Sequence, residues 1–285
     1  VSVGQSIGMK DETAARCFAT HNLTLSLMIS LVWASILFFF SVPIVDFYEL
    51  KSHIADNAVN YLRIVSTAFP FVFMSAAATG IFNASGRSKI PFTINGIGLA
   101  INMILDPLFI FVFDWKTDGA AWATWIAQAC VFFFFVYQLK YKQILWEEFR
   151  FFGKLKRVYT TRIIKIGLPV ACLNTLFAFV NMFLGRTAST VGGHIGLMAM
   201  TTSGQIEAIT WNTSQGFSTA LSAFVAQNYA ARRINRVMKA LKSTLLMTFV
   251  FGIICSCLFI FYGNQIFSIF VPEREAYEAG GLALR

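Results

Sequence analysis

An acidic residue inside an apolar run is the clearest sign of chemistry in this sequence. Asp106 lies seven residues from the outer end of the run 91–113, which places it about 10 Å deep if the run is helical. A carboxylate in a membrane helix costs on the order of 2.5–3.5 kcal/mol on insertion scales, so such acids usually face a cavity and take part in function. The alternative is a protonated Asp106 that only bonds a neighbouring helix.

Further oxygen donors accompany this acid. Asn102 lies one helical turn earlier on the same face. Pro107 has no N–H to give to the carbonyl of Met103, which leaves an additional acceptor nearby. Thr124, in the next run, lies at a depth similar to that of the acid when both are counted from the connecting turn. Hard oxygen ligands suit Na⁺ or a titrating proton, so Asn102, Asp106 and Thr124 form the predicted coupling site.

Polar side chains also follow one face of the run 195–225. They recur at helical spacing, which predicts a stripe: Thr201, Gln205, Asn212, Gln215, Thr219 and Ser222. The preceding run has a shorter stripe of Asn174 and Asn181. A stripe of this kind lines a wet cavity or bonds helices together. We interpret Asn174, Asn181, Thr201, Gln205, Asn212 and Gln215 as substrate-lining, with helix bonding as the alternative.

The remaining reactive side chains give weaker signals. Glu207 is a second acid within a span and lies off the stripe, so it is either a second proton site or a partner for Arg186. The five cysteines lack metal-ligand spacing and are interpreted as packing residues. The three histidines share no ligand spacing, so no metal is assigned to them. No resident cofactor is expected beyond a coupling Na⁺ or H⁺.

These residues need apolar helices to position them. The 285 residues are 56% hydrophobic and 13% charged, with a mean hydropathy of +0.63, whereas soluble domains carry about 25% charged residues. This composition excludes a soluble enzyme, a disulfide scaffold and most nucleic-acid binders. Seven runs approach or exceed the roughly 20 residues that span a bilayer: 23–47, 61–82, 91–113, 119–139, 163–184, 195–225 and 245–270. The predicted fold is an all-α polytopic membrane protein.

The loop charges predict the orientation. Most of the 23 Lys and Arg fall in the loops on the side of residues 1–22, while most acids lie opposite. By the positive-inside rule, residues 1–22 and 140–162 are cytoplasmic. Residues 150–162 are basic with interspersed aromatic side chains, which predicts an amphipathic connector on the inner membrane surface. Binding of a regulatory peptide is the alternative for this segment.

An internal repeat predicts the domain organisation. A shift of 222 residues aligns loop, apolar run and acidic loop without a gap, with Lys10 over Arg232 and Leu23 over Leu245. Internal repeats of this kind are usual in secondary transporters. We expect an N-terminal lobe at 1–140, the amphipathic connector at 141–162 and a partial C-terminal lobe at 163–285. The chain would then hold the end of helix 2 to helix 9 of a twelve-helix protein.

Several motifs resemble the multidrug and toxic compound extrusion (MATE) family of the multidrug/oligosaccharide-lipid/polysaccharide exporter superfamily. They are NMILDPLFIF at 102–111, GAAWAT at 119–124, YLRI at 61–64, NASGRSK at 83–89 and FVAQN at 224–228. The resemblance implies a two-lobed, twelve-helix exporter of cationic or amphipathic compounds, driven by Na⁺ or H⁺. It also implies a helix-one Asp in the site, which would precede Val1. The family often has Gly after the last of these motifs, where this chain has YAA at 229–231, so we expect a less tight turn.

Three functions are compatible with these features. The first is cation-coupled efflux of small organic molecules from the cell membrane, with no nucleic acid and no obligate protein partner besides membrane lipid. The alternative is a lipid-linked oligosaccharide flippase of the same superfamily, which would hold more basic residues in its cavity. An intramembrane enzyme would need a nucleophile–base pair or a metal set in the spans, and the spans contain neither. The chain is therefore expected not to be an enzyme.

Overall fold

The fold is known from a computed structural model that describes residues 1–46, 52–141, 150–270 and 280–281. Over those ranges the chain forms helices joined by turns and contains no strand, so the predicted all-α class is confirmed. The chain divides into two compact units, Val1–Ile163 and Ile164–Arg285. The organisation into segments 1–140, 141–162 and 163–285 stays a prediction.

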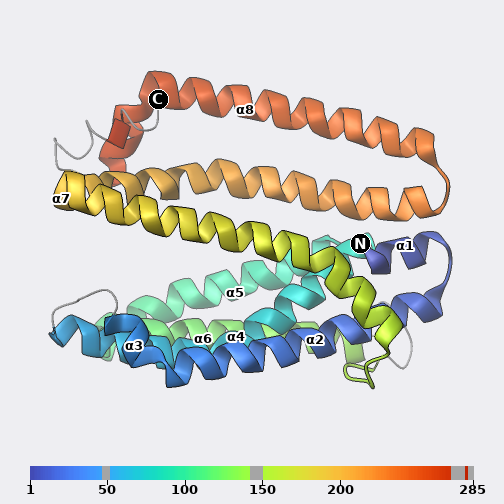
Figure 1. Ribbon diagram of the computed structural model, residues 1–285, viewed down its shortest axis with the longest axis horizontal. Helices are drawn as coiled ribbons and strands as arrows, with labels where there is room; N and C mark the ends of the chain where they lie inside the picture. Colours follow the sequence, from blue (N-terminus) through green and yellow to red (C-terminus); the bar gives the residue numbers. More distant parts are fainter. Residues whose placement is uncertain (47–51, 142–149, 271–279, 282–285) are drawn as a thin grey trace. The chain divides into compact units, whose positions relative to one another are not determined.

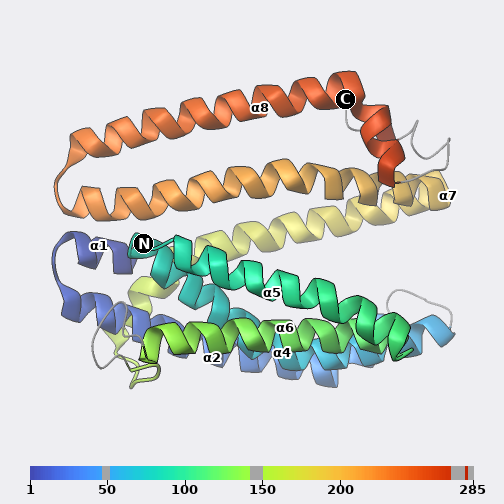
Figure 2. The same ribbon diagram turned by 180° about the vertical axis from the view of Figure 1, so that it is seen from behind.

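The first unit is built around α4. Its elements are α1 (Ser2–Gly8), α2 (Glu12–Phe39), α3 (Ser41–Asp46), α4 (Ser52–Ala84), α5 (Lys89–Pro107), the π-helix η1 (Leu108–Val112), α6 (Lys116–Val136) and the π-helix η2 (Tyr137–Tyr141). α4 packs against both α2 and α6, while α5 packs mainly against α6 (Figures 1 and 2). The core between these helices is apolar and includes Leu23, Ala78, Phe82 and Phe135.

The second unit consists of long antiparallel helices. α7 (Arg157–Ala230), whose first turns belong to the first unit, is interrupted at Gly193, whose φ of 55° and ψ of −144° are non-helical. Its two parts run in opposite directions, the first yellow and the second orange in Figure 1. α8 (Ile234–Phe270) returns along the second part and buries Phe267 against Ile206. Only glycine adopts this backbone conformation without strain, so Gly193 sets the reversal.

Six helices are long and apolar enough to cross a membrane. They correspond to six of the seven predicted runs, but they start earlier because polar turns extend the helices: α2 begins at Glu12, where the Asp11 carboxylate accepts the Ala14 N–H at 2.9 Å and caps the helix. The seventh run, 195–225, is helical as the second part of α7 but is not among the six. Its polar stripe lowers its hydropathy, which separates this helix from the six more apolar ones.

The turn between α1 and α2 contains a left-handed residue. Lys10 has a φ of 63°. Its N–H donates to the Ile7 carbonyl at 3.0 Å, and the next N–H, of Asp11, reaches back to the Ser6 carbonyl at 2.9 Å. This pair of bonds is a Schellman motif, which satisfies the last carbonyls of a helix and reverses the chain tightly.

The turn between α7 and α8 is the same, 222 residues later. Arg232 has a φ of 57°. Its N–H donates to the Tyr229 carbonyl at 2.9 Å, and the Arg233 N–H donates to the Asn228 carbonyl at 2.8 Å. The expected loosening after 229–231 was wrong, because Arg232 adopts the conformation that a glycine would supply. The repeat found in the sequence is thus a repeat of backbone geometry at this turn.

The connector differs from a surface helix. Residues 150–156 have no regular secondary structure, and α7 already starts at Arg157. Phe151 packs against the core of the first unit, and the Thr20 hydroxyl donates to the Arg150 carbonyl at 2.7 Å. Part of the apolar area that predicted membrane contact is therefore used inside the protein. Residues 142–149 lie outside the described ranges.

The left-handed turn predicts an effect of glycine substitution. A non-glycine residue in this conformation costs about 1 kcal/mol, so Arg232→Gly should stabilise the protein by up to that amount. Arg233→Gly removes the same charge from a residue without positive φ and should bring no gain. Thermal unfolding of the detergent-solubilised variants measures both. Equal shifts in the two midpoints would show that the charge, and not the backbone, decides.

Candidate functional site

The predicted site lies on the hairpin of α5 and α6, whose helices approach closely. A Cβ on Gly119 would lie 2.9 Å from the carbonyl carbon of Phe109, so the two backbones meet there. Further along, Gly98 packs directly against the Val131 side chain. The Trp115 N–H closes the turn on the Phe109 carbonyl at 3.0 Å. These close approaches fix how far the two helices are shifted along each other.

Asp106 and Asn102 are in contact on α5. The Asn102 Nδ2 donates to Asp106 Oδ1 over a long 3.4 Å, and both side chains are half-buried. Directly after Asp106, the α-helix ends at Pro107 and the π-helix η1 begins. In η1 the Phe113 N–H donates to the Leu108 carbonyl at 3.0 Å. Insertions of π-helix are frequent at functional sites. The carboxylate therefore lies where the helix changes its hydrogen-bonding pattern.

Thr124 lies at the height expected from the sequence. Because Gly119 faces Phe109 and Gly98 faces Val131 on antiparallel helices, Thr124 lies at a level between Asn102 and Asp106. On α6 it is on the opposite side from the exposed Trp122. It is half-buried. The structure thus brings Asn102 and Asp106 into contact and places Thr124 at their level. Within the described residues, Thr124 forms no hydrogen bond with either of them.

A further polar residue of α5, near Asn102 and Asp106, escaped the sequence analysis. Asn95 lies seven residues before Asn102 on the same face, and its Nδ2 donates to the Pro91 carbonyl at 2.8 Å and to Thr79 Oγ1 of α4 at 3.4 Å. The seven-residue spacing that drew attention to Asn174 and Asn181 would also have found it. Asn95 extends the polar face of α5 from the acid toward the start of the helix.

In the second unit the polar stripe points away from α8. Ser203 and Ile206 are buried on one side of α7, whereas Gln205, Asn212 and Gln215 are exposed about a third to half of a helical turn away. Hydroxyls of the stripe bond their own helix, as Thr201 does to the Met198 carbonyl at 3.1 Å. The amides of the stripe are therefore not used to hold α8.

The other predicted lining residues lie on the first part of α7. Asn174 and Asn181 are both exposed, and the Asn181 Nδ2 donates to the Phe177 carbonyl of its own helix at 2.9 Å. Glu207 is exposed as well, and no ion pair within 4.0 Å joins it to Arg186 in the described ranges. Neither role considered for Glu207 is tested by this geometry.

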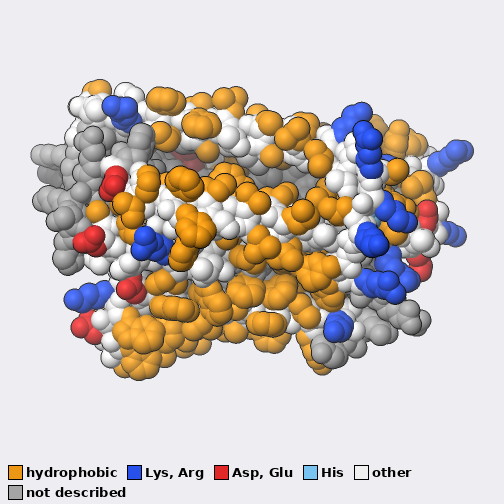
Figure 3. Space-filling model, turned by 60° about the horizontal axis from the view of Figure 1, so that its bottom comes forward, with side chains coloured by type: hydrophobic (Ala, Val, Ile, Leu, Met, Phe, Trp, Pro, Cys, Tyr) orange, Lys and Arg blue, Asp and Glu red, His pale blue; other side chains and the backbone are white. Residues whose placement is uncertain are grey.

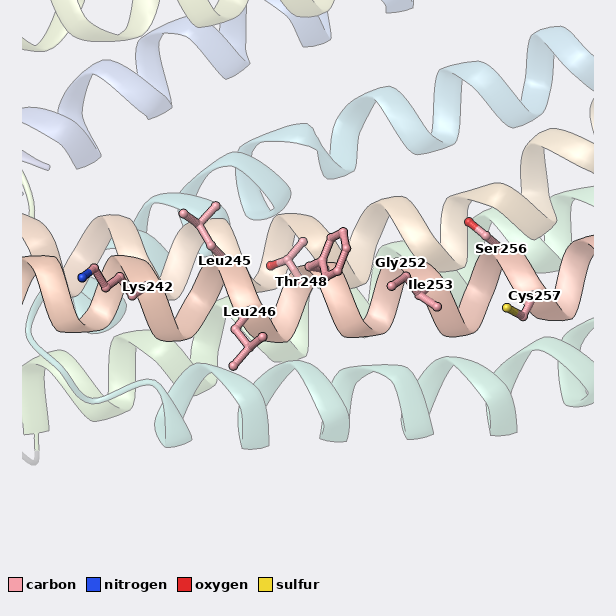
Figure 4. Close-up of a pocket in the computed structure, with 9 residues that line it drawn as sticks. Lys242, Leu245, Leu246, Thr248, Gly252, Ile253, Ser256 and Cys257 are labelled. Carbon is pink, nitrogen blue, oxygen red and sulfur yellow. The ribbon is translucent and has the colours of Figure 1, made fainter.

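Metal-ligand clusters and disulfides do not appear in the described part of the chain. No group of three or more His, Cys, Asp or Glu there could hold a metal ion. All five cysteines are free thiols. A hollow of about 920 Å³ runs along α8 (Figure 4), but every lining residue comes from that single helix. With its mostly apolar lining, this hollow has no convergent polar groups that would make it a binding site.

The surface agrees with a membrane setting. In Figure 3 hydrophobic side chains cover the middle of the visible face, and most Lys and Arg gather near the ends of the helices. Exposed apolar residues such as Phe92, Phe111 and Ile269, each more than three-quarters exposed, are common on these helices. A soluble protein rarely exposes so much apolar area.

Comparison with known families identifies the chain. The MatE family profile matches residues 1–108 and 167–285. The chain belongs to the MatE family. Members of this family are multi-pass membrane transporters, which confirms the resemblance seen in the sequence. The first matched segment includes Asn102 and Asp106, whereas Thr124 lies between the two matched segments.

Related proteins share the family. The chain is 25% identical to the probable multidrug resistance protein YoeA of Bacillus subtilis (strain 168). The aligned region covers 96% of the chain and 61% of that relative. The chain is 22% identical to the multidrug export protein MepA of Staphylococcus aureus (strain MSSA476), over 99% of the chain and 62% of that protein. The chain thus spans about three-fifths of the length of these MatE relatives.

Solved structures share the fold. A MOP superfamily transporter from Pyrococcus furiosus superposes with a TM-score of 0.86 at 22% identity, over 99% of the chain and 63% of that structure. A MATE transporter in complex with MaL6 gives a TM-score of 0.89 at 20% identity, over 99% and 63%. At this identity the likeness shows the MATE fold of the described helices.

The glycine packing of the hairpin predicts a pair of opposite mutational effects. Gly119→Ala places a methyl group against the Phe109 backbone and should destabilise the protein by about 1–3 kcal/mol. Gly96→Ala, on α5 with open space around it, should be neutral or stabilise by up to about 1 kcal/mol through helix propensity. Thermal unfolding in detergent compares them. A Gly119 variant as stable as the Gly96 variant would contradict the close approach.

Proposed function

We propose that this chain is part of an exporter that moves cationic or amphipathic small molecules out of the cell in exchange for Na⁺ or H⁺. The observation that carries the proposal is the half-buried Asp106 in contact with Asn102 on a membrane helix. Relatives named for multidrug resistance and multidrug export support the substrate class. Small organic molecules and membrane lipid are the proposed partners.

Asp106 is the proposed coupling group. A carboxylate binds either a proton on its Oδ atoms or Na⁺ through them, and either cation removes the cost of a bare charge in the membrane. Asn102 offers the carbonyl oxygen of its amide, and Thr124, at the same level, offers its hydroxyl. The long Asn102–Asp106 bond is easily given up when a cation takes its place, because its geometry is poor.

The polar stripe of α7 is the proposed substrate surface. Gln205, Asn212 and Gln215 are exposed and point away from α8, which supports a role other than holding that helix. Neutral amides bind varied compounds weakly, as an exporter of several substrates requires. Asn174, Asn181 and Thr201 complete the proposed lining.

The proposed setting is the cell membrane, with residues 1–22 and the connector 140–162 on the cytoplasmic side. The gathering of Lys and Arg in those loops supports it through the positive-inside rule. A lipid-linked oligosaccharide flippase is the alternative activity. Export of a fluorescent cation by the full-length protein in liposomes, driven by a Na⁺ or H⁺ gradient, separates the two.

The coupling role predicts a selective loss on neutralisation. Asp106→Asn in the full-length protein should abolish gradient-driven efflux while membrane insertion stays normal or improves, because a buried charge is removed. Asp114→Asn is the matched control, since Asp114 is exposed in the turn and asparagine tolerates its φ of 53°. Efflux of a fluorescent cation from loaded liposomes measures both. Efflux by the Asp106 variant at the wild-type rate would contradict the role of Asp106 as the coupling group.

The lining role predicts water access that substrate blocks. Cysteines introduced at Gln205, Asn212 and Gln215 should react with a water-soluble thiol reagent, and an exported cation should slow the reaction. Ser203→Cys provides the control, because Ser203 is only 5% exposed. The leucine variants Asn212→Leu and Gln215→Leu should change which compounds are exported more than the thermal stability. Absence of labelling at all three positions would exclude the cavity.

A further inference from the structure

The connector is attached to α2 through a buried histidine. His21 is 4% exposed. Its Nδ1 lies 2.7 Å from the Cys17 carbonyl oxygen, and the backbone N–H of Lys156 donates to its Nε2 at 2.8 Å. A backbone N–H only donates, so Nε2 must be the accepting nitrogen and the ring proton must lie on Nδ1. The imidazole is therefore neutral in this arrangement.

Protonation is incompatible with this arrangement. An imidazolium carries a hydrogen on both nitrogens, so Nε2–H would point at the Lys156 N–H and two donors would face each other. The Cys17 bond would survive, but the bond that crosses from α2 to the connector would be lost. We propose that His21 is a proton-operated latch, which holds the connector on α2 at Lys156 while the ring is neutral and releases it at this residue when the ring is protonated.

The other bonds of the connector do not titrate in the same range. The Thr20 hydroxyl donates to the Arg150 carbonyl at 2.7 Å, and the Arg162 guanidinium donates to Gln5 Oε1 at 2.8 Å. Histidine is the side chain whose charge ordinarily changes between pH 5 and 8, whereas a hydroxyl, an amide and a guanidinium keep theirs. The His21 bond is thus the pH-dependent part of the attachment.

The groups around His21 come from several elements. From α2, Cys17 lies one turn before it, and from α7 the Tyr159 ring lies with its centroid 5.1 Å from the imidazole and its hydroxyl interacting with the Cys17 thiol. The cations are Lys156 of the connector and Arg162, which lies over the Phe18 ring at 5.6 Å. The Asp11 carboxylate, before α2, interacts electrostatically with the Tyr159 hydroxyl. The core residues that α4 contributes are apolar: Met74, Ala77, Ala78, Ile81, Phe82 and Ala84.

The latch lies within the first unit, shortly before α7. Residues 150–156 directly precede α7, which leads into the second unit. Release of the Lys156 bond would free the backbone at this residue, while the Thr20 bond to Arg150 and the Arg162 bond to Gln5 still hold the segment on both sides. The proposal concerns the attachment of the connector alone, and it stands or falls independently of the function of Asp106.

Hydrogen exchange of the Lys156 amide tests the latch. The full-length protein in detergent is measured at pH 5 and pH 8 by mass spectrometry with peptide fragmentation, and the rates are corrected for the intrinsic pH dependence of exchange. The protection of this amide should be about tenfold lower at pH 5, as for the loss of one hydrogen bond. Equal protection at both pH values would overturn the proposal.

Two variants locate the effect. His21→Gln keeps an acceptor that does not titrate, so its Lys156 amide should be equally protected at pH 5 and pH 8. Thr20→Val removes the neighbouring bond to Arg150 and should leave the wild-type ratio between the two pH values intact. A glutamine variant that retains the wild-type pH dependence would show that another group is responsible, and the latch would be wrong.

Discussion

The structure depends on one constraint: a membrane offers no hydrogen-bond partners, so each polar group within a span must find its own. The backbone does so by forming helices. Many hydroxyl side chains do so by bonding the carbonyl three or four residues earlier, as Thr24, Thr93 and Thr248 do at 2.8–2.9 Å. A carboxylate cannot bond a carbonyl because both groups accept, and an amide keeps an oxygen that no carbonyl can satisfy. Acids and amides therefore stand out in the sequence, whereas a threonine such as Thr124 becomes a candidate only through its position beside them.

The same constraint explains how much the sequence predicted. The apolar runs were visible because helices that cross lipid need about 20 apolar residues. The basic loops were visible because Lys and Arg collect on one side of a membrane. Helix starts were missed, because a capped polar turn such as the one at Asp11 carries no hydropathy signal. The tight turn at Arg232 was missed for another reason: the sequence shows no glycine there, and only the backbone reveals the left-handed conformation.

The candidate site was predicted in part for a physical reason as well. Asn102 and Asp106 share one face by helical spacing, so their contact follows from sequence alone. The depth of Thr124 on another helix depends on packing, which Gly119 and Gly98 determine by letting the backbones approach. Asn95 was missed although its spacing from Asn102 was visible. Its hydrogen bond to Thr79 of α4 appears only in the structure.

The polar second part of α7 shows how the two demands on a transporter helix compete. A span that lines a wet pathway must carry amides, and each amide lowers the hydropathy by which spans are recognised. This part of α7 compensates on its other face, where Ile206 packs on Phe267 and Ser203 is buried. A helix that is apolar on one side and polar on the other is stable in a membrane only beside other protein or water. The stripe therefore requires a neighbour or a cavity on its polar side, whichever compounds pass it.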